Sequence, residues 1–167
     1  MKIGVISDIH GNDVALKAVL SDAASMGVEH LLILGDVVGY YYNPDKVLLQ
    51  LLDWPKDMIA GNHELMLKQS RTDNEYLEKV TRQYGSGIKV ALQKLTDKQI
   101  DYLGDLPEYK NIILDNVNIG LYHGSPRDNN EYIYPDASYD LLKQISRAPQ
   151  DYILMGHTHY PMCAHMG

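Results

Sequence analysis

The chain has 167 residues, of which 45% are apolar and 22% charged, and its formal net charge is −7. This length suffices for one hydrophobic core, so we expect a single domain over residues 1–167. The acidic balance, with no run of Lys and Arg, argues against duplex nucleic acid as a partner. No apolar run reaches the ~18 residues that a membrane helix requires, so we expect no membrane partner. A single cysteine, Cys163, permits no intrachain disulfide, and we expect a reducing, cytoplasmic setting.

The chain begins by alternating between strand and helix patterns. An apolar run over 2–7 predicts a strand, and the carboxylate of Asp8 directly after it argues against a secretory signal. Further strands are predicted at 30–34 and 57–60. Asn12 or Asp13 caps a helix that ends at Gly27, and Asn43-Pro44 begins another helix. The first helix is expected to turn these side chains inward: Val14, Ala15, Ala18, Val19 and Ala23. The βαβαβ order predicts a largely parallel core.

The second half of the chain changes character twice. Residues 64 to about 106 have a helical pattern, in which Thr96 and Gln99 resemble a capping box. Two apolar runs at 110–114 and 117–122, joined by Asp115-Asn116, predict a β-hairpin. A helix over about 138–147 and a strand over 151–155 follow. We therefore expect an α/β fold of two packed sheets with helices outside.

Five short turns, each directly after a predicted strand or run, carry side chains that can bind a metal. They are Asp8-Ile9-His10-Gly11, Gly35-Asp36, Gly61-Asn62-His63-Glu64, His123-Gly124 and Gly156-His157-Thr158-His159. Because ligands bind at the carboxyl ends of strands in open α/β sheets, we expect these turns to meet at one edge. Asp8 with His10, and His157 with His159, are spaced by two residues, which in an extended backbone places both side chains on one side.

The donor types predict which metals would bind. Imidazole, carboxylate and amide donors suit Mn, Fe, Zn or Ni better than Ca or Mg alone, and Mn²⁺ is the first choice. No thiol lies near the set, which argues against a structural zinc site. A lone carboxylate between two histidine-bearing halves suits a bridge between two divalent ions, which lie about 3.5–4 Å apart in such sites.

Each residue alone has a plainer structural interpretation. Asp8 could cap the following turn, Asp36 could be a turn residue, and His123 could be a hydrogen-bonded core residue. Jointly these interpretations fail, because five of the seven histidines fall in the five turns. The other two, His30 and His165, are interpreted as surface residues.

The ordered motifs D-x-H, G-D, G-N-H-E, H-G and G-H-x-H, running from Asp8 to His159, resemble those of the calcineurin-like metallophosphoesterase superfamily. The flanking residues at 6–12, 35–40 and 123–127 are similar to its small bacterial and archaeal phosphodiesterase-type branch. The resemblance implies a four-layer αββα sandwich of two mixed β-sheets flanked by helices. It covers almost the whole chain.

The resemblance also implies roles for individual residues. One metal would be held by Asp8, His10 and His159, the second by Asn62, His123 and His157, with Asp36 bridging both. His63 would face the scissile phosphate, stabilise charge and protonate the leaving oxygen, while a metal-bound hydroxide attacks. Asn12 and Arg127 are candidate contacts to substrate oxygens, although Arg127 is equally a candidate surface residue.

Three departures from the family pattern bear on specificity. Protein phosphatases and diadenosine tetraphosphatases carry Asp-Arg shortly after the bridging aspartate, where this chain has Gly39-Tyr40, which weakens a protein phosphatase interpretation. The branch has a Gly soon after that tyrosine, where this chain has Tyr41-Tyr42. The family's C-terminal strands are missing after His159, so we expect an exposed sheet edge that favours a homo-oligomer or aggregation.

The predicted function is hydrolysis of phosphodiester bonds in a small phosphate ester, possible substrates including nucleotides. The alternatives are a phosphomonoesterase, a dinucleoside polyphosphate hydrolase, or a non-catalytic scaffold of the same fold, and the retained His63 favours catalysis. Tyrosines at 40–42, 132 and 134 predict stacking of an aromatic or nucleoside leaving group, with Tyr41 as a candidate substrate contact. Alternatively, because the chain contains no Phe, these tyrosines simply pack the rim.

Overall fold

The computed structural model describes residues 1–166. Its elements follow one another along the chain as β1 (Ile3–Ile6), α1 (Asp13–Ser25), β2 (His30–Ile33), α2 (Pro44–Leu51), β3 (Lys56–Met58), α3 (Asn62–Ser70), α4 (Asn74–Tyr84), α5 (Gly87–Lys94), α6 (Asp97–Gly104), β4 (Tyr109–Leu114), β5 (Val117–Tyr122), α7 (Tyr139–Ile145) and β6 (Tyr152–Leu154).

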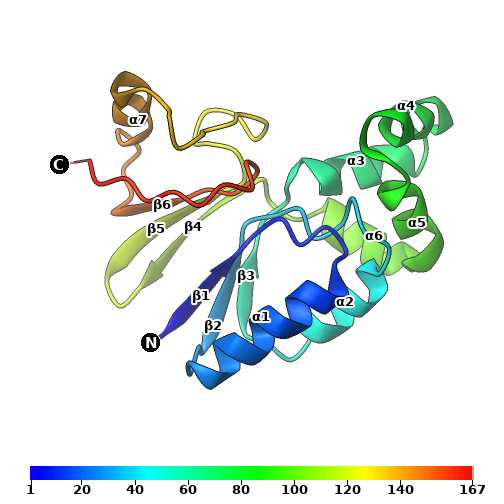
Figure 1. Ribbon diagram of the computed structural model, residues 1–167, viewed down its shortest axis with the longest axis horizontal. Helices are drawn as coiled ribbons and strands as arrows, with labels where there is room; N and C mark the ends of the chain where they lie inside the picture. Colours follow the sequence, from blue (N-terminus) through cyan, green and yellow to red (C-terminus); the bar gives the residue numbers. More distant parts are fainter. Residues whose placement is uncertain (167) are drawn as a thin grey trace.

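The strands form two three-stranded sheets, ordered β1-β2-β3 and β4-β5-β6. The first sheet is parallel throughout, while in the second β4 and β5 form an antiparallel hairpin and β6 joins β5 in parallel. The two sheets face each other, with α1 and α2 outside the first sheet, α7 outside the second, and α3 to α6 gathered at one side (Figure 1). This arrangement confirms the expected α/β sandwich, in which α7 alone supplies the fourth layer. The expectation that both sheets are mixed is wrong for the first, which is parallel because its strands are joined by helical crossovers.

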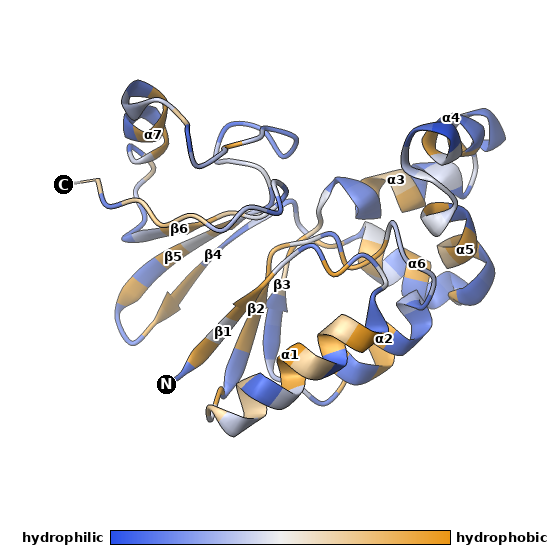
Figure 2. Cartoon of the chain, viewed as in Figure 1, coloured by the Kyte–Doolittle hydropathy of each residue, from blue (hydrophilic) through white to orange (hydrophobic). Residues whose placement is uncertain are grey.

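Alternation along β2 divides the core in two, because successive side chains of a strand point to opposite faces. Leu32 and Leu34 pack with Ile119 and Leu121 between the sheets. Leu31 and its neighbours on the other face pack against the helices. Apolar residues are accordingly concentrated in β1, β2 and β5, whereas α4 is largely hydrophilic (Figure 2). The core fixes the two sheets against each other and hence the relative positions of the turns at their ends.

The predicted elements are all present, and their ends differ from the prediction by two residues at most. Helix α1 is capped by Asn12, whose side chain accepts a hydrogen bond from the Ala15 N–H, and Thr96 with Gln99 forms the expected capping box. The face predicted to turn inward on α1 is wrong, because Val14, Ala15, Ala18 and Val19 are exposed. The buried side chains are Leu16 and Leu20, which are larger and remove more apolar surface from water.

The surface assignment of His30 is also wrong, whereas His165 is exposed as expected. His30 begins β2, its side chain is only 20% exposed, and its Nε2 lies 2.8 Å from Asp57 Oδ2. Lys110 contacts the other oxygen of Asp57. This pairing links β2, β3 and β4 away from the strand ends that carry the candidate ligands. The longest described helix, α1, has 13 residues, and none of the helices in residues 1–166 could cross a bilayer.

Candidate metal centre

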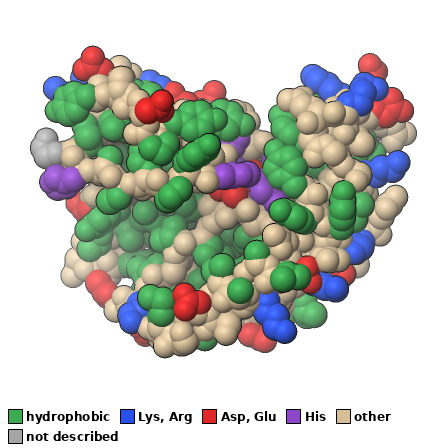
Figure 3. Space-filling model, in the orientation of Figure 1, with side chains coloured by type: hydrophobic (Ala, Val, Ile, Leu, Met, Phe, Trp, Pro, Cys, Tyr) green, Lys and Arg blue, Asp and Glu red, His purple; other side chains and the backbone are tan. Residues whose placement is uncertain are grey.

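The predicted ligands meet at one place, where the strands of both sheets end. Asp8 and His10 follow β1, Asp36 follows β2, Asn62 and His63 open α3 after β3, and the remaining three histidines follow β5 and β6. Histidine side chains lie at the base of the notch between the part of the surface that carries α7 and the part formed by α3 to α6 (Figure 3). The structure therefore brings together all seven residues that the sequence proposed as metal ligands.

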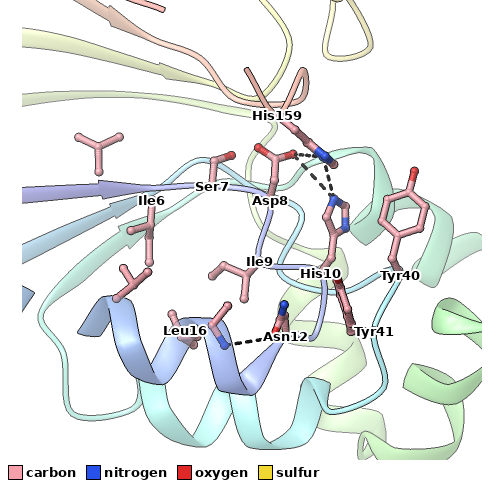
Figure 4. A pocket seen from close by; sticks show the side chains of 13 residues that line it. Ile6, Ser7, Asp8, Ile9, His10, Asn12, Leu16, Tyr40, Tyr41 and His159 are labelled. Carbon is pink, nitrogen blue, oxygen red and sulfur yellow. Dashed lines mark hydrogen bonds and ion pairs between the residues drawn. The ribbon is translucent and has the colours of Figure 1, made fainter. Parts of the chain in front are cut away.

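Three of these residues form a first cluster beside β1. His10 Nε2 lies 3.1 Å from His159 Nε2, and Asp8 Oδ1 lies 3.3 Å from His159 Nε2 and 3.9 Å from His10 Nε2. The three side chains point toward one another from the turns after β1 and β6 (Figure 4). This is one of the groups with metal-binding geometry in the described residues.

A second cluster gathers around His123. Its Nε2 lies 2.9 Å from Asn62 Oδ1, 3.1 Å from His157 Nδ1 and 3.3 Å from Asp36 Oδ2. His123 is fully buried. The four donors are two imidazoles, one carboxylate and one amide oxygen, which is a set suited to a transition metal.

Asp36 lies between the two clusters. Its Oδ2 is 3.3 Å from His123 Nε2 in the second cluster and 3.6 Å from His10 Nε2 in the first. Oδ1 accepts a hydrogen bond of 2.9 Å from the His63 N–H, which fixes the carboxylate. One carboxylate oxygen thus faces both donor sets, as a bridging ligand would.

The donor spacing fits divalent metals. Metal–nitrogen distances of about 2.0–2.1 Å separate neighbouring ligands by about 2.8–3.4 Å in octahedral or tetrahedral geometry, which matches the 3.1 Å between the two Nε2 atoms of the first cluster. Asp8 Oδ1 is buried without a hydrogen-bond partner in the described residues. Since burial of an unpaired carboxylate oxygen is costly, a cation at this place accounts for both observations.

The backbone holds the ligands in an unusual conformation. Asp8, His10, Asp36, His157 and His159 all have φ between 51° and 69°. The extended backbone assumed for the two i, i+2 pairs is therefore wrong, although both pairs converge. Left-handed conformations of non-glycine residues are uncommon and cost of order 1–3 kcal/mol each, so the surrounding structure must hold these turns.

Carbonyl oxygens orient two of the imidazoles. His10 Nδ1 lies 3.0 Å from the Val38 carbonyl oxygen, and His123 Nδ1 lies 2.7 Å from that of Leu34. Because a carbonyl only accepts, each Nδ1 carries the proton and donates it. Once neutral, each imidazole would present its Nε2 lone pair to the cluster, as metal-ligating histidines do.

Glu64 supports the centre, and sequence reasoning assigned it no role. Its buried carboxylate accepts hydrogen bonds from the N–H groups of Asp36, Val37 and Val38 at 2.8–3.1 Å, and from that of Gly61 at 2.8 Å. It therefore ties the turn after β2 to the start of α3. Burial raises the pKa of Glu64 to about 7, with the charge of Asp36 adding to the rise and the backbone donors opposing it. A glutamate at the third residue of a helix was the available sequence signal.

The protonation states follow from burial and from Asp36. Burial raises the pKa of Asp36, but the hydrogen bond with His123 and the charges of the nearby histidines outweigh it and lower that pKa to about 2. Burial lowers the pKa of His123, but its hydrogen bond with Asp36 and that residue's charge raise it to about 9. Burial lowers the pKa of His10 and of His157. Without metal, a proton therefore resides between Asp36 and His123.

His63 lies at the centre but has a different environment from the ligands. Its Nε2 is 3.9 Å from Asp36 Oδ2, and its buried Nδ1 has no hydrogen-bond partner in residues 1–166. Its ring packs edge-on against those of His10 and Tyr84. Burial lowers the pKa of His63 to about 4, so the imidazole is neutral near neutral pH.

A small cavity opens above the centre, with a volume of about 200 Å³. Its walls are His10, Asp36, Asn62, His63, His157, Thr158, His159, Tyr40, Tyr84 and Tyr132. Tyr84 had no signal in the local sequence, because it comes from the end of α4, far from any of the motifs. Within the described chain, no Lys or Arg lines this cavity.

The weaker substrate-contact predictions lie elsewhere. Asn12 and Tyr41 line a larger groove of about 960 Å³ along β1 and α1, and the Asn12 side chain is engaged as the α1 cap (Figure 4). The Arg127 guanidinium is held by Glu131 and Gln144. The structure therefore gives no support to Arg127 as a phosphate contact and favours the surface interpretation.

The chain is similar in sequence to a known protein family and to individual proteins. The sequence model of the calcineurin-like phosphoesterase superfamily domain matches residues 1–167. Protein MJ0912 of Methanocaldococcus jannaschii is 32% identical over 95% of this chain and 63% of its own length. A metallophosphoesterase from Sphaerobacter thermophilus is 31% identical with a TM-score of 0.73, covering 95% of this chain and 61% of its own.

A third similar protein shares the fold. The hypothetical protein PH1004 from Pyrococcus horikoshii OT3 is 24% identical with a TM-score of 0.83, covering 96% of this chain and 70% of its own. The chain thus spans less than two thirds of the length of the M. jannaschii and S. thermophilus relatives.

Proposed function

The chain belongs to the calcineurin-like phosphoesterase superfamily, and from this premise we propose that it hydrolyses phosphodiesters at a centre of two divalent metals. Asp8, His10 and His159 would hold one ion, Asn62, His123 and His157 the other, and Asp36 would bridge them. Mn²⁺ is the proposed ion, with Fe, Ni or Zn as alternatives for the same donors. Bound divalent metals lower the pKa of water and offset the charge of a phosphate.

The residues that line the cavity are the observation that supports a phosphodiester as the substrate. Its described walls contain imidazoles, an amide, three phenols, the hydroxyl of Thr158 and the carboxylate of Asp36, but no Lys or Arg. A phosphomonoester carries close to two negative charges at neutral pH, because its second pKa is about 6, whereas a diester carries one. No cationic side chain adds to the charge of the two proposed ions, so the walls of the cavity give a dianion no further advantage over the monoanion.

His63 is the proposed catalytic residue of the chain itself. It lies beside the bridging Asp36 and lines the cavity, where its Nε2–H can donate to the leaving oxygen as negative charge develops there. The lowered pKa of His63 favours this neutral donor over a resting imidazolium. As the phosphorus–oxygen bond breaks, this Nε2–H would stabilise the leaving oxygen by a hydrogen bond, and the leaving oxygen takes its proton from water.

A variant separates catalysis by His63 from metal binding. His63→Ala should lower kcat by about 10²–10⁴-fold, the range for a general acid or donor. Its metal content and Tm should match those of wild type and of the control His165→Ala, whose side chain is exposed. Loss of metal in His63→Ala would make it a ligand and overturn its proposed role.

A substrate panel tests the proposed reaction. Protein reconstituted with Mn²⁺ is assayed on an aryl phosphodiester, a cyclic nucleotide, a dinucleoside polyphosphate and an alkyl monoester. We expect the highest kcat/KM on a diester, with activity lost in chelator. Fastest turnover of the monoester or of the polyphosphate would replace the diesterase by that alternative, and no turnover of any ester by fully loaded protein would favour a scaffold.

A preference for aryl or nucleoside leaving groups is part of the same proposal. Tyr132 packs one face on His157 with centroids 4.0 Å apart and lies parallel to Tyr134. Tyr41 lies over the adjoining groove. If an aromatic leaving group stacks here, Tyr41→Ala should slow the aryl diester more than an alkyl diester, and equal losses would reject stacking at Tyr41.

A further inference from the structure

Three tyrosines reach the metal centre from three separate parts of the chain. Tyr40 lies in the loop after β2, Tyr84 ends α4, and Tyr132 lies in the loop between β5 and α7. All three line the cavity of about 200 Å³ above the candidate ligands. No single motif contains them, so their convergence is a property of the fold.

Each of the three rings is fixed by an imidazole of the centre. Tyr40 packs on His10 with centroids 4.6 Å apart and an angle of 70°. Tyr84 packs on His63 at 5.4 Å, and Tyr132 packs on His157 at 4.0 Å. A ring held against a rigid neighbour keeps its hydroxyl in one place, which lowers the entropy cost of using that hydroxyl to bind a ligand.

The hydroxyl protons of these tyrosines are free to be donated. In residues 1–166, the Tyr40 and Tyr132 hydroxyls have no hydrogen-bond partner, and the Tyr84 hydroxyl accepts from Gln83 Nε2 at 2.9 Å and keeps its own proton. The Tyr40 ring stands beside His10 with its hydroxyl on the same side of the site as His159 (Figure 4). Three tyrosines whose O–H protons are available therefore line a cavity whose described walls contain no Lys or Arg.

We infer that Tyr40, Tyr84 and Tyr132 are substrate-binding residues whose hydroxyls donate hydrogen bonds to the oxygens of a monoanionic phosphodiester. We call these three residues the phenol clamp. The inference rests on the proposed function, because it assigns the non-metal contacts of that same substrate. The phenol clamp would donate hydrogen bonds to the phosphate oxygens, as arginine does in many other sites. Unlike arginine it adds no positive charge, and so it gives no advantage to a dianion.

The phenol clamp is tested by removing one hydroxyl at a time. Tyr40→Phe, Tyr84→Phe and Tyr132→Phe keep each ring against its imidazole. Tyr109→Phe and Tyr139→Phe serve as matched controls, because both side chains are exposed and neither lines the cavity. The probe is dimethylphosphinate, a monoanion whose phosphorus–carbon bonds cannot be hydrolysed, and its Kd for Mn²⁺-loaded protein is measured by calorimetry alongside the metal content.

Each clamp variant should raise the Kd of dimethylphosphinate by about 10- to 100-fold, as expected for a hydrogen bond to a charged group. The same variants should lower kcat/KM on an aryl phosphodiester, with metal content equal to wild type in all of them. The control variants should match wild type. Clamp variants within about twofold of wild type in both measurements would overturn the inference and leave the rings as packing groups.

The outcome separates the clamp from the proposed function. If wild-type protein hydrolyses diesters fastest but the three Phe variants are unaffected, the function stands and the clamp is wrong. If the Phe variants lose dimethylphosphinate binding while wild type prefers a monoester, the clamp stands and the diesterase is wrong.

Discussion

Gly39 lies where a side chain would push against two histidines of the site. A Cβ at this position would collide with His10 Nδ1 and would lie 2.6 Å from His63 Nδ1, and the residue has φ of 142°. Ordinary van der Waals contact begins near 3.4 Å. Gly39→Ala therefore requires His63 to move by about 0.8 Å, and His10 by more, unless the backbone gives way.

The expected effect follows from this displacement. A misplacement of about 1 Å in a catalytic group can cost about 10²-fold in rate, so kcat/KM should fall by about that factor. His10 must also turn away from Asp8 and His159, so affinity for the metal of the first cluster should fall. Backbone strain from the unusual φ adds about 1–3 kcal/mol of destabilisation.

Substitution of a second glycine, Gly85, distinguishes the effect of backbone strain from that of a steric clash. Gly85 has φ of 82°, and nothing lies within 4 Å of a Cβ built on it. Gly85→Ala should thus share the loss of stability but retain activity and metal. We would measure kcat/KM, metal content per chain and urea unfolding for both variants. Gly39→Ala with wild-type activity and two bound ions would refute the argued contact between this position and the two imidazoles.

Three further predictions concern metal binding and association. Asp36→Asn should weaken both ions together, because one carboxylate faces both clusters; elemental analysis showing loss of only one ion would contradict the bridge. The pKa of His123, raised to about 9, makes its pairing with Asp36 stabilise the metal-free protein fully between about pH 4 and pH 6.5 and progressively less as pH rises through 9. Since metal must displace that proton, Mn²⁺ affinity should rise over the same window, and calorimetry showing a constant affinity would reject this. In the described residues β1 is an edge strand and α1 has an exposed apolar face, and both should promote association of copies of the chain. Light scattering that shows a monomer at all concentrations would contradict this prediction.

The sequence predicted the meeting place of the ligands because its signals are local. Asp8, His123 and His157 each sit directly after an apolar run, and parallel strands end at the same edge of a sheet. The outline of the fold was predictable for the same reason, since apolar periodicity and capping residues are short-range patterns. The α1 face was not, because this helix is apolar on more than one side, and only the larger Leu16 and Leu20 reach the core.

Features that depend on the whole fold could not be predicted. Tyr84 reaches the cavity only because α3 and α4 pack together at the side of the sheets. Glu64 was visible as a helix-start residue, but its contacts with the N–H groups after β2 required the three-dimensional arrangement. The left-handed backbone at Asp8 and His10 contradicts the simple expectation of an extended pair. Asp and His adopt this conformation more often than most other non-glycine residues, but that preference is too weak to predict it at a given position.

These long-range features act together to shape the site before any ion binds. A left-handed aspartate or histidine relaxes toward ordinary φ values unless neighbouring segments prevent it. Here the His10 N–H donates to the Asp36 carbonyl and the Asp8 N–H to that of Gly35, so the turns after β1 and β2 restrain each other. Glu64 then fastens the second turn to α3, and His157 N–H donates to Asp8 Oδ2 across the two sheets. The ligands are consequently held within metal-binding distance by the backbone network, and binding need only displace the proton shared by Asp36 and His123.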